Sequence, residues 1–457
     1  MEINWRKKSR EASFWHINES NGKVQCELCP RHCELGEDKM GFCLVRGNVK
    51  NKMHTFNYGI SVQATIECIE TEAVNHYMPG ARILSMGNVG CMMACTYCQN
   101  WQTSQVKFLN DKNVREYTPE DVVNLAIENN INVISWTYND PVVWQEFVVD
   151  TSRLAQQKGI KTLYKSALYI EEKPLAQLIE VIDIFSISLK CMDPKMYIKY
   201  TKGKLEPVLK AIKQIAATNR HLEISQLVVT DLNDDGNDAR KTAIWMRENL
   251  SENVPLHLVA YHPAFRYTKE RTSIDKLLEL RQIVLEEGIK YCYLGNVYAD
   301  NMSNTNCIKC GHRQVERFGL TVNVCGLDEN GKCSNCKEQS PIREALKGIS
   351  SKFTAPDFKG YQEYSLDWDR EVNSIHVSID DKHKDLILKI ERNPGNKTEM
   401  IQVRKGLERI IISRSFAEEK NVKISSNLDC KIDYLAVLDR AHFPVSDKST
   451  ASDKYLN

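Results

Sequence analysis

The sequence contains no long apolar run. No stretch approaches the ~20 apolar residues that a transmembrane helix needs, and the first eight residues lack the apolar core of a signal peptide. We therefore expect a cytoplasmic protein without a membrane partner.

An excess of charge of either sign is also missing. The formal net charge is +1, so the chain lacks the basic character of a nucleic-acid-binding protein, and we expect no nucleic-acid partner. Internal repeats and long low-complexity tracts are absent as well. A chain of 457 residues exceeds one typical core, so about two to four structural units are expected.

Cysteine, in contrast, is abundant. Sixteen cysteines in a chain without a recognisable signal peptide favour metal thiolates over disulfides. Eleven of them fall into three groups. These groups are Cys26, Cys29, Cys33 and Cys43; Cys91, Cys95 and Cys98; and Cys307, Cys310, Cys333 and Cys336.

The second group has the spacing C-x3-C-x2-C, which allows one loop to ligate a single cluster. A four-iron cube normally takes four thiolates, so three thiolates leave one iron open to bind and reduce another molecule. Zinc is the alternative, but a zinc site needs four ligands. No fourth cysteine lies nearby, and His76 lies some distance upstream. The group therefore favours an open 4Fe-4S cluster.

Strand-like and helix-like segments alternate between about residues 83 and 300. A capping box at 118–121 opens a helix through 129, and a second helix is expected over 141–157. Strand-like runs lie at 82–86, 133–136, 161–164, 184–187, 222–229, 256–260 and 291–294. This alternation predicts an α/β fold with a parallel sheet, most simply a partial (β/α)6 TIM-like barrel.

A parallel barrel carries its chemistry at the carboxyl ends of its strands. The three-cysteine loop follows the first expected strand. Further polar residues follow the later strands: Asn139 and Asp140, Lys165 and Ser166, Ser188 and Lys190, and His262. We therefore expect these side chains to gather at one rim.

At this point the residues resemble a known family. The loop from Cys91 to Cys98 matches the C-x3-C-x-aromatic-C signature of radical S-adenosylmethionine (SAM) enzymes. The longer stretch from Gly87 to Trp101 looks like AmmeMemoRadiSam-system radical SAM proteins, which are similar to the activating enzymes of pyruvate formate-lyase. Further matches over about residues 20–340 are Cys26-Glu-Leu-Cys29-Pro, Gly41-Phe-Cys43, Met78-Pro-Gly80, Tyr138-Asn-Asp-Pro141, Leu205-Glu-Pro-Val208, Leu232-Asn-Asp234, His262-Pro263 and Gly295-Asn-Val297.

The resemblance implies that the open iron chelates the methionine part of SAM. One electron would then cleave the sulfonium, and the 5′-deoxyadenosyl radical released would take hydrogen from a substrate. The resemblance also implies positions for the residues that hold SAM. Tyr97 would lie near the adenine, Asn139 and Asp140 near the methionine amino group, Ser188 and Lys190 facing SAM, and His262 near SAM or the substrate.

The sequence departs from this family at three points. Related proteins usually have Glu at position 140, Thr-Asn-Gly at 166–168 and Asp at 188, where this chain has Asp140, Ser166-Ala-Leu168 and Ser188. Asp is one methylene shorter than Glu but can still pair with an ammonium group. Ala167 and Ser188 lose polar groups that would contact SAM or substrate, so we expect an altered pocket.

The other two cysteine groups predict further metal sites. Cys307, Cys310, Cys333 and Cys336 form two C-x2-C knuckles, which predict a structural zinc ribbon; rubredoxin-like iron and a partner-docking module are the alternatives. Cys26, Cys29, Cys33 and Cys43 have irregular spacing that matches neither a zinc site nor an iron–sulfur motif well, so zinc and an auxiliary iron–sulfur cluster both stay open. His32 adds another possible ligand there.

The sequence divides into four expected segments. They are a Cys-rich segment at 1–75, the radical SAM barrel at 76–302, the zinc-ribbon-like module at 303–345, and a β-rich or α+β accessory domain at 350–457. Strand-like runs at 374–378, 386–389 and 409–413 support the last of these. The accessory domain could recognise a carrier or partner, or could only stabilise the fold.

Two classes of function remain. The first is a radical SAM enzyme that acts on a small molecule or peptide, with SAM and a reductase or flavodoxin/ferredoxin-like electron donor as partners. A glycyl-radical-enzyme activase is a variant of this reading. The second is a non-enzymatic, zinc-binding scaffold for a protein partner.

Overall fold

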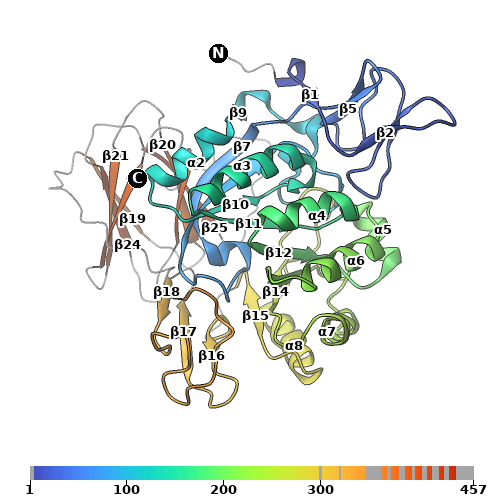
Figure 1. Ribbon diagram of the computed structural model, residues 1–457. Helices are drawn as coiled ribbons and strands as arrows, with labels where there is room; N and C mark the ends of the chain where they lie inside the picture. The colour runs from blue at the N-terminus through green and yellow to red at the C-terminus, as the bar shows by residue number, and fades with distance from the viewer. Residues whose placement is uncertain are drawn as a thin grey trace.

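The computed structural model describes residues 5–297, 301–318 and 321–345 and, beyond these, seven strands between 362 and 438 (Figure 1). None of the described helices is long and apolar enough to cross a membrane. The rest of the expected accessory domain lies outside the described residues.

Seven parallel strands form the centre of the fold. In spatial order they follow the chain: β8 (Arg82–Asn88), β10 (Val133–Thr137), β11 (Lys161–Ser166), β12 (Ile184–Leu189), β13 (His221–Val228), β14 (Leu256–Ala260) and β15 (Cys292–Gly295). All seven expected strands are confirmed.

Helices connect these strands and cover the sheet (Figure 1). They are α2 (Pro119–Glu128), α3 (Gln145–Gln157), α4 (Glu172–Val181), α5 (Pro194–Thr201), α6 (Leu205–Ala216), α7 (Asn237–Asn249) and α8 (Ile274–Glu286). Together they make six β/α units followed by β15, so the predicted α/β partial barrel is confirmed. Antiparallel β7 (Ile60–Cys68) pairs with β8 and extends the sheet beyond the parallel strands.

Local sequence signals explain where these helices begin. The Thr118 side chain accepts a hydrogen bond from the Asp121 amide, and the Asp121 side chain accepts one from the Thr118 amide, so the capping box forms as predicted. The expected helix over 141–157 begins with a 3-10 turn at Pro141–Trp144 and continues as α3. Trp136, Trp144 and Phe147 then pack together in the core between sheet and helix.

Two small sheets precede the barrel. One contains β1 (Arg10–Glu11), β6 (Lys52–Thr55) and β5 (Arg46–Val49), and the other contains β2 (Trp15–Ile17), β3 (Val24–Cys26) and β4 (Glu34–Leu35). A buried ion pair fixes them to the barrel, because Arg46 Nη1 lies 3.0 Å from Glu146 Oε1 on α3. The same Glu146 oxygen accepts a hydrogen bond from the Ser13 amide.

The remaining strands follow the barrel. A three-stranded module contains β16 (Thr305–Asn306), β17 (Arg313–Phe318) and β18 (Thr321–Val324). Four C-terminal strands form a separate sheet: β19 (Gln362–Asp367), β24 (Asn421–Ser426), β21 (Leu386–Asn393) and β22 (Lys397–Val403). The other three, β20 (Val372–Ile379), β23 (Arg409–Ser413) and β25 (Ile432–Leu438), extend the barrel sheet through pairing of β23 with β7.

Candidate active site

The three-cysteine loop leaves the carboxyl end of β8. Backbone hydrogen bonds hold it against the end of α5, from the Ala94 amide to the Thr201 carbonyl (3.0 Å) and from the Thr96 amide to the Tyr200 carbonyl (2.8 Å). The Gly90 amide donates to the Thr103 carbonyl at the far end of the loop. The loop is therefore fixed on both sides.

Cys91, Cys95 and Cys98 are all half-buried in this loop. Burial raises the pKa of each thiol, and Asp140 adds to the rise for Cys91. The Lys190 ammonium opposes the rise for Cys95. Because metals bind the thiolate, metal uptake at this loop must release protons.

Asp140 follows β10 and faces the cysteine loop. Its carboxylate accepts hydrogen bonds from the Val142 amide (3.2 Å), the Ser166 hydroxyl (2.8 Å) and the Ala167 amide (2.8 Å). Burial raises the pKa of Asp140, while these three donors and Lys190 oppose that rise. The carboxylate thus joins the carboxyl ends of β10 and β11 and keeps one lone pair for a further donor.

Asn139 braces the other side of the loop. Its side-chain amide donates to the Asn88 carbonyl, and its oxygen accepts a hydrogen bond from the Thr103 hydroxyl at 3.1 Å. Both ends of the amide thus contact the chain and position Asn139 beside the loop, while one N–H and one lone pair remain open, so its predicted place near the methionine amino group stays a prediction.

Lys190 and Ser188 lie at the carboxyl end of β12. Lys190 is half-buried, and its ammonium makes no hydrogen bond or ion pair within the described residues. Its charge acts on Asp140, Cys95 and Cys98. The Ser188 hydroxyl lies 3.4 Å from the Ser225 hydroxyl. The rim therefore holds a cation available to an anionic group.

Tyr97 and His262 lie on the side of β13 and β14. Tyr97 is buried with Val229 and Tyr261. The Nδ1 atom of His262 lies 3.1 Å from the side-chain amide of Gln99, directly after the cysteine loop. Because an amide nitrogen donates, Nδ1 is the acceptor in this pair.

Four buried polar atoms near this rim have no hydrogen-bond partner within the described residues. They are Asn88 Oδ1, Thr96 Oγ1, Gln226 Oε1 and Thr230 Oγ1. Buried polar groups nearly always have partners in native proteins. These atoms are therefore available to a polar ligand or to water at this end of the barrel.

The other two cysteine groups differ from each other in sulfur spacing. The ligand atoms of Cys307, Cys310, Cys333 and Cys336 all lie within 4.8 Å of one another, with Sγ–Sγ distances of 3.6 Å and 3.7 Å for two pairs. A tetrahedral ion with ~2.3 Å bonds to sulfur needs sulfurs about 3.8 Å apart. This group is therefore preformed for one metal ion.

Cys26, Cys29, Cys33 and Cys43 line a single small cavity in the N-terminal segment. Cys26 and Cys29 are buried, and Cys33 and Cys43 are half-buried. The structure thus brings all four together.

Comparison with known proteins decides the family. The model of the radical SAM superfamily matches residues 87–241. The uncharacterized protein MJ0808 of Methanocaldococcus jannaschii is 35% identical over 336 residues, which are 73% of this chain and 99% of that protein. This chain belongs to the radical SAM superfamily.

More distant relatives were also found. Pyruvate formate-lyase 1-activating enzyme of Escherichia coli strain K12 is 24% identical over 195 residues, 40% of this chain and 75% of that enzyme. The (2S)-3-sulfopropanediol dehydratase activating enzyme of Klebsiella oxytoca is 27% identical over 115 residues, 25% of this chain and 36% of that enzyme. A solved structure of a radical SAM methyltransferase from Sphaerobacter thermophilus is 16% identical in sequence, with a TM-score of 0.38. The alignment covers 52% of this chain and 71% of the methyltransferase chain.

Membership of the radical SAM superfamily implies a 4Fe-4S cluster and SAM, and the residues at the rim fit both. Three thiols come from one fixed loop, and their three sulfur atoms do not all lie within 4.8 Å of one another, which is compatible with a multi-iron cluster. SAM carries an ammonium, a carboxylate and sugar hydroxyls, which match Asp140, Lys190 and the unpartnered polar atoms of the rim.

Lys165 is expected at the rim, but the structure holds its side chain in a polar network inside this radical SAM barrel that the sequence did not predict. Lys165 Nζ donates to the Glu72 carbonyl and to the hydroxyls of Ser186 (3.0 Å) and Ser225 (2.8 Å). Burial lowers the pKa of Lys165 to about 8, although Glu72 opposes this. The available signal was the polar residue at every second position of β12 and β13, which places Ser186, Ser188, Glu223 and Ser225 on one face.

A second missed network closes the opposite, amino end of the barrel. Both carboxylate oxygens of buried Glu223 accept hydrogen bonds, from His221 (2.8 Å) and His257 (2.7 Å), and the amides of Asn75 and His76 donate to the same carboxylate. His76 itself pairs with the Tyr293 hydroxyl at 2.6 Å, so it is no ligand for the cysteine loop.

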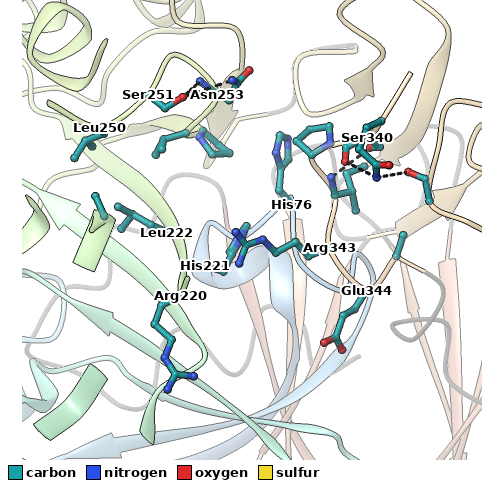
Figure 2. A pocket seen from close by; sticks show the side chains of 18 of the residues that line it. His76, Arg220, His221, Leu222, Leu250, Ser251, Asn253, Ser340, Arg343 and Glu344 are labelled. Atoms are coloured by element: carbon teal, nitrogen blue, oxygen red, sulfur yellow. Dashed lines mark hydrogen bonds between the residues drawn. The ribbon is translucent and has the colours of Figure 1, made fainter. Parts of the chain in front are cut away.

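A cavity of about 830 Å³ lies at this amino end, between the barrel and residues 329–345 (Figure 2). His221 and Leu222 at the start of β13 line it, as do Leu250 after α7 and Arg343. Because barrel chemistry occurs at the carboxyl ends of the strands, this cavity is not the candidate active site.

Proposed function

We propose that this chain reductively cleaves SAM at a 4Fe-4S cluster held by Cys91, Cys95 and Cys98. The 5′-deoxyadenosyl radical produced would abstract hydrogen from a small-molecule or peptide substrate. The observation that carries this proposal is a fixed loop with three cysteines at the carboxyl end of β8. Beside it lie a buried carboxylate and a cation that has no partner among the described residues.

The remaining roles follow from the charges at the rim. Lys190 would bind the carboxylate of SAM, since its ammonium has no partner within the described residues. Asp140 would accept a hydrogen bond from the amino group with a lone pair that the chain leaves open. Tyr97 would lie near the adenine, with Ser188 and His262 near SAM or the substrate.

The metal at Cys307, Cys310, Cys333 and Cys336 would be structural zinc. All four ligands come from the protein, which leaves no position open for a substrate. The site lies in a module that a buried ion pair fixes to the barrel, since Arg317 Nε is 3.1 Å from Glu70 Oε1. The electron for SAM cleavage would come from a reductase or a flavodoxin/ferredoxin-like protein.

Activation of a glycyl-radical enzyme is the second candidate. Two of the distant relatives are named as activating enzymes, which supports this class. Ala167 and Ser188 replace polar residues usual in related proteins and favour a small molecule or peptide instead. Deuterium labelling separates the two: a labelled small molecule would pass deuterium into 5′-deoxyadenosine, whereas an activase would leave a glycyl radical on a protein partner.

Anaerobic reconstitution with iron and sulfide tests the proposed chemistry. With dithionite and SAM, we expect 5′-deoxyadenosine from the native chain and from Cys292→Ala, which changes a buried cysteine of β15 outside the groups. Cys95→Ala should produce none. Absence of a cluster and of 5′-deoxyadenosine in the native chain would favour the zinc-binding scaffold, and cleavage by Cys95→Ala would refute the ligand assignment.

A further inference from the structure

We propose that Cys26, Cys29, Cys33 and Cys43 hold a second 4Fe-4S cluster and not a zinc ion. Cys26 ends β3, Cys29 and Cys33 lie between β3 and β4, and Cys43 lies between β4 and β5. The inference rests on this N-terminal site alone and does not depend on the proposed reaction.

The enclosure is the first observation. The four cysteines share their cavity with apolar side chains, including Leu28, Leu35, Met92 and Val143. The cavity is therefore protected from water on several sides, as an oxygen-sensitive cluster requires. Met92 comes from the loop that carries Cys91, so the two cysteine sites are neighbours.

Sulfur spacing is the second observation. Among the described residues, the ligand atoms of one cysteine group all lie within 4.8 Å of one another. This is the group of Cys307, Cys310, Cys333 and Cys336. No three ligand atoms of the N-terminal group meet this condition, and the same is true of Cys91, Cys95 and Cys98, which are assigned to a cube. A single tetrahedral ion would need sulfurs about 3.8 Å apart, so the N-terminal sulfurs are spread more widely in this structure than those of a zinc site.

The ligand count is the third observation. His32 lies within this segment, but its Nε2 is 3.0 Å from Glu171 Oε1 and its Nδ1 is 3.3 Å from Glu27 Oε2. Both ring nitrogens are thus engaged by carboxylates. Four thiolates remain, a number that closes a four-iron cube or a zinc site, so the count excludes a histidine ligand and the spacing of the sulfurs favours the cube.

A buried donor at the cavity is the fourth observation. Arg46 lines the cavity, and its Nε has no hydrogen-bond partner within the described residues, although Nη1 pairs with Glu146 and Nη2 with the Ser13 carbonyl. An unpartnered buried N–H is rare. Sulfur atoms of iron–sulfur clusters accept such hydrogen bonds, and a guanidinium would offset the negative charge of the cluster.

Close packing joins this site to the Cys91 loop. The Arg31 side chain, which also lines the cavity, donates to the Met92 carbonyl. A Cβ atom placed on Gly90 would meet Val45 at 2.8 Å and the Cys43 carbonyl at 3.1 Å, and φ at Gly90 is +86°. Only glycine fits at this position, so the loop that carries Cys91 packs directly against the segment that carries Cys43.

Metal and sulfide analysis of the full chain tests the assignment. A variant with Cys91, Cys95 and Cys98 all changed to alanine keeps all four cysteines of the N-terminal site. After anaerobic reconstitution we expect it to keep about half of the native iron and acid-labile sulfide, about four of each per chain. Adding Cys26→Ser should remove that remainder, whereas adding Cys191→Ser, a buried cysteine after β12, should not.

Three outcomes would overturn the proposal. The triple variant could hold no sulfide and about two zinc ions per chain, which would make the N-terminal group a second zinc site. It could hold about two irons and two sulfides, which would indicate a smaller cluster. It could also hold neither sulfide nor a second metal ion, which would show that the four cysteines bind nothing.

Discussion

Asp140 serves the fold and the candidate site with one carboxylate. Three donors from its own chain fix its orientation, and the same group faces the thiols of the cysteine loop. The shorter Asp side chain fits because β10 and β11 bring Ser166 and Ala167 directly to it.

Asp140→Asn should weaken SAM binding roughly tenfold or more, since hydrogen bonds to charged groups contribute about 1.5–3 kcal/mol. The new side-chain amide would also place an N–H group against the Ser166 hydroxyl or the Ala167 amide, which donate to the native carboxylate. Equilibrium dialysis of SAM against the reconstituted protein measures the effect, with Asp140→Glu as the conservative control. Equal affinity of Asp140→Asn and native protein would remove Asp140 from the SAM site.

Glu67 on β7 and Glu72 in the 3-10 turn that follows it (Ile69–Glu72) form a pair of buried carboxyl groups. Burial and the nearby Glu72 raise the pKa of Glu67 from 4.5 to about 7, although Tyr138, Thr71 and Ser85 donate to it. Between these two pH values the folded chain keeps a proton that the unfolded chain has lost. Stability therefore falls as the pH rises from about 4.5 to about 7.

Glu67→Gln should flatten this pH dependence, because the amide does not titrate. Urea unfolding at several pH values from 4.5 to 7 measures it. Glu128→Gln, on the exposed end of α2, serves as the control and should keep the native slope. A slope unchanged by Glu67→Gln would contradict the assigned pKa.

At the scale of elements, Glu223 holds the amino end of the barrel together. Burial alone would raise its pKa, but hydrogen bonds from His221 and His257 hold the pKa well below its usual range. The amides of Asn75 and His76 bind the same carboxylate. One side chain thus ties β13, β14 and the turn that precedes β8.

Glu223→Gln should lower the free energy of unfolding by about 2–3 kcal/mol, since the amide leaves buried donors without an acceptor. Urea denaturation compares it with Glu248→Gln, which changes an exposed glutamate of α7. If Glu223→Gln lost no more unfolding free energy than Glu248→Gln, the hydrogen-bond network of Glu223 would contribute nothing to the stability of the fold.

At the scale of the whole molecule, two cysteine-rich modules are attached to the barrel by buried ion pairs. Arg317 and Glu70 attach the Cys307 module, and Arg46 and Glu146 attach the N-terminal sheets. The division at 1–75, 76–302, 303–345 and 350–457 stays a prediction, and β23 adds a strand from the last segment to the barrel sheet.

Cys333→Ser should remove about one zinc ion per chain and lower the melting temperature, while the iron content stays unchanged. Cys325→Ser is the matched control, since this exposed cysteine lies in the same module outside the four-cysteine group. Elemental analysis and calorimetry measure both. Iron in place of zinc in the purified native chain would favour the rubredoxin-like alternative.

Much of the barrel could be predicted because its strands and caps are local signals. The strand at 133–136 and the capping box at Thr118 can be recognised from residues adjacent in the sequence. Parallel strands then bring the residues that follow them, Asp140 and Lys190, to one rim of the barrel. The pairing of β23 with β7 joins residues 409–410 to 65–66, and no local pattern encodes such a distant contact. The anchoring of Asn139 by Asn88 and Thr103 likewise depends on tertiary structure.

The central claim is that SAM supplies the fourth ligand to the cluster at Cys91, Cys95 and Cys98. Electron–nuclear double resonance of the reduced native chain with SAM labelled by nitrogen-15 at the amino group tests this directly. We predict a hyperfine coupling between the amino nitrogen and the cluster. A cluster signal that forms normally but shows no coupling to the labelled nitrogen would contradict the account.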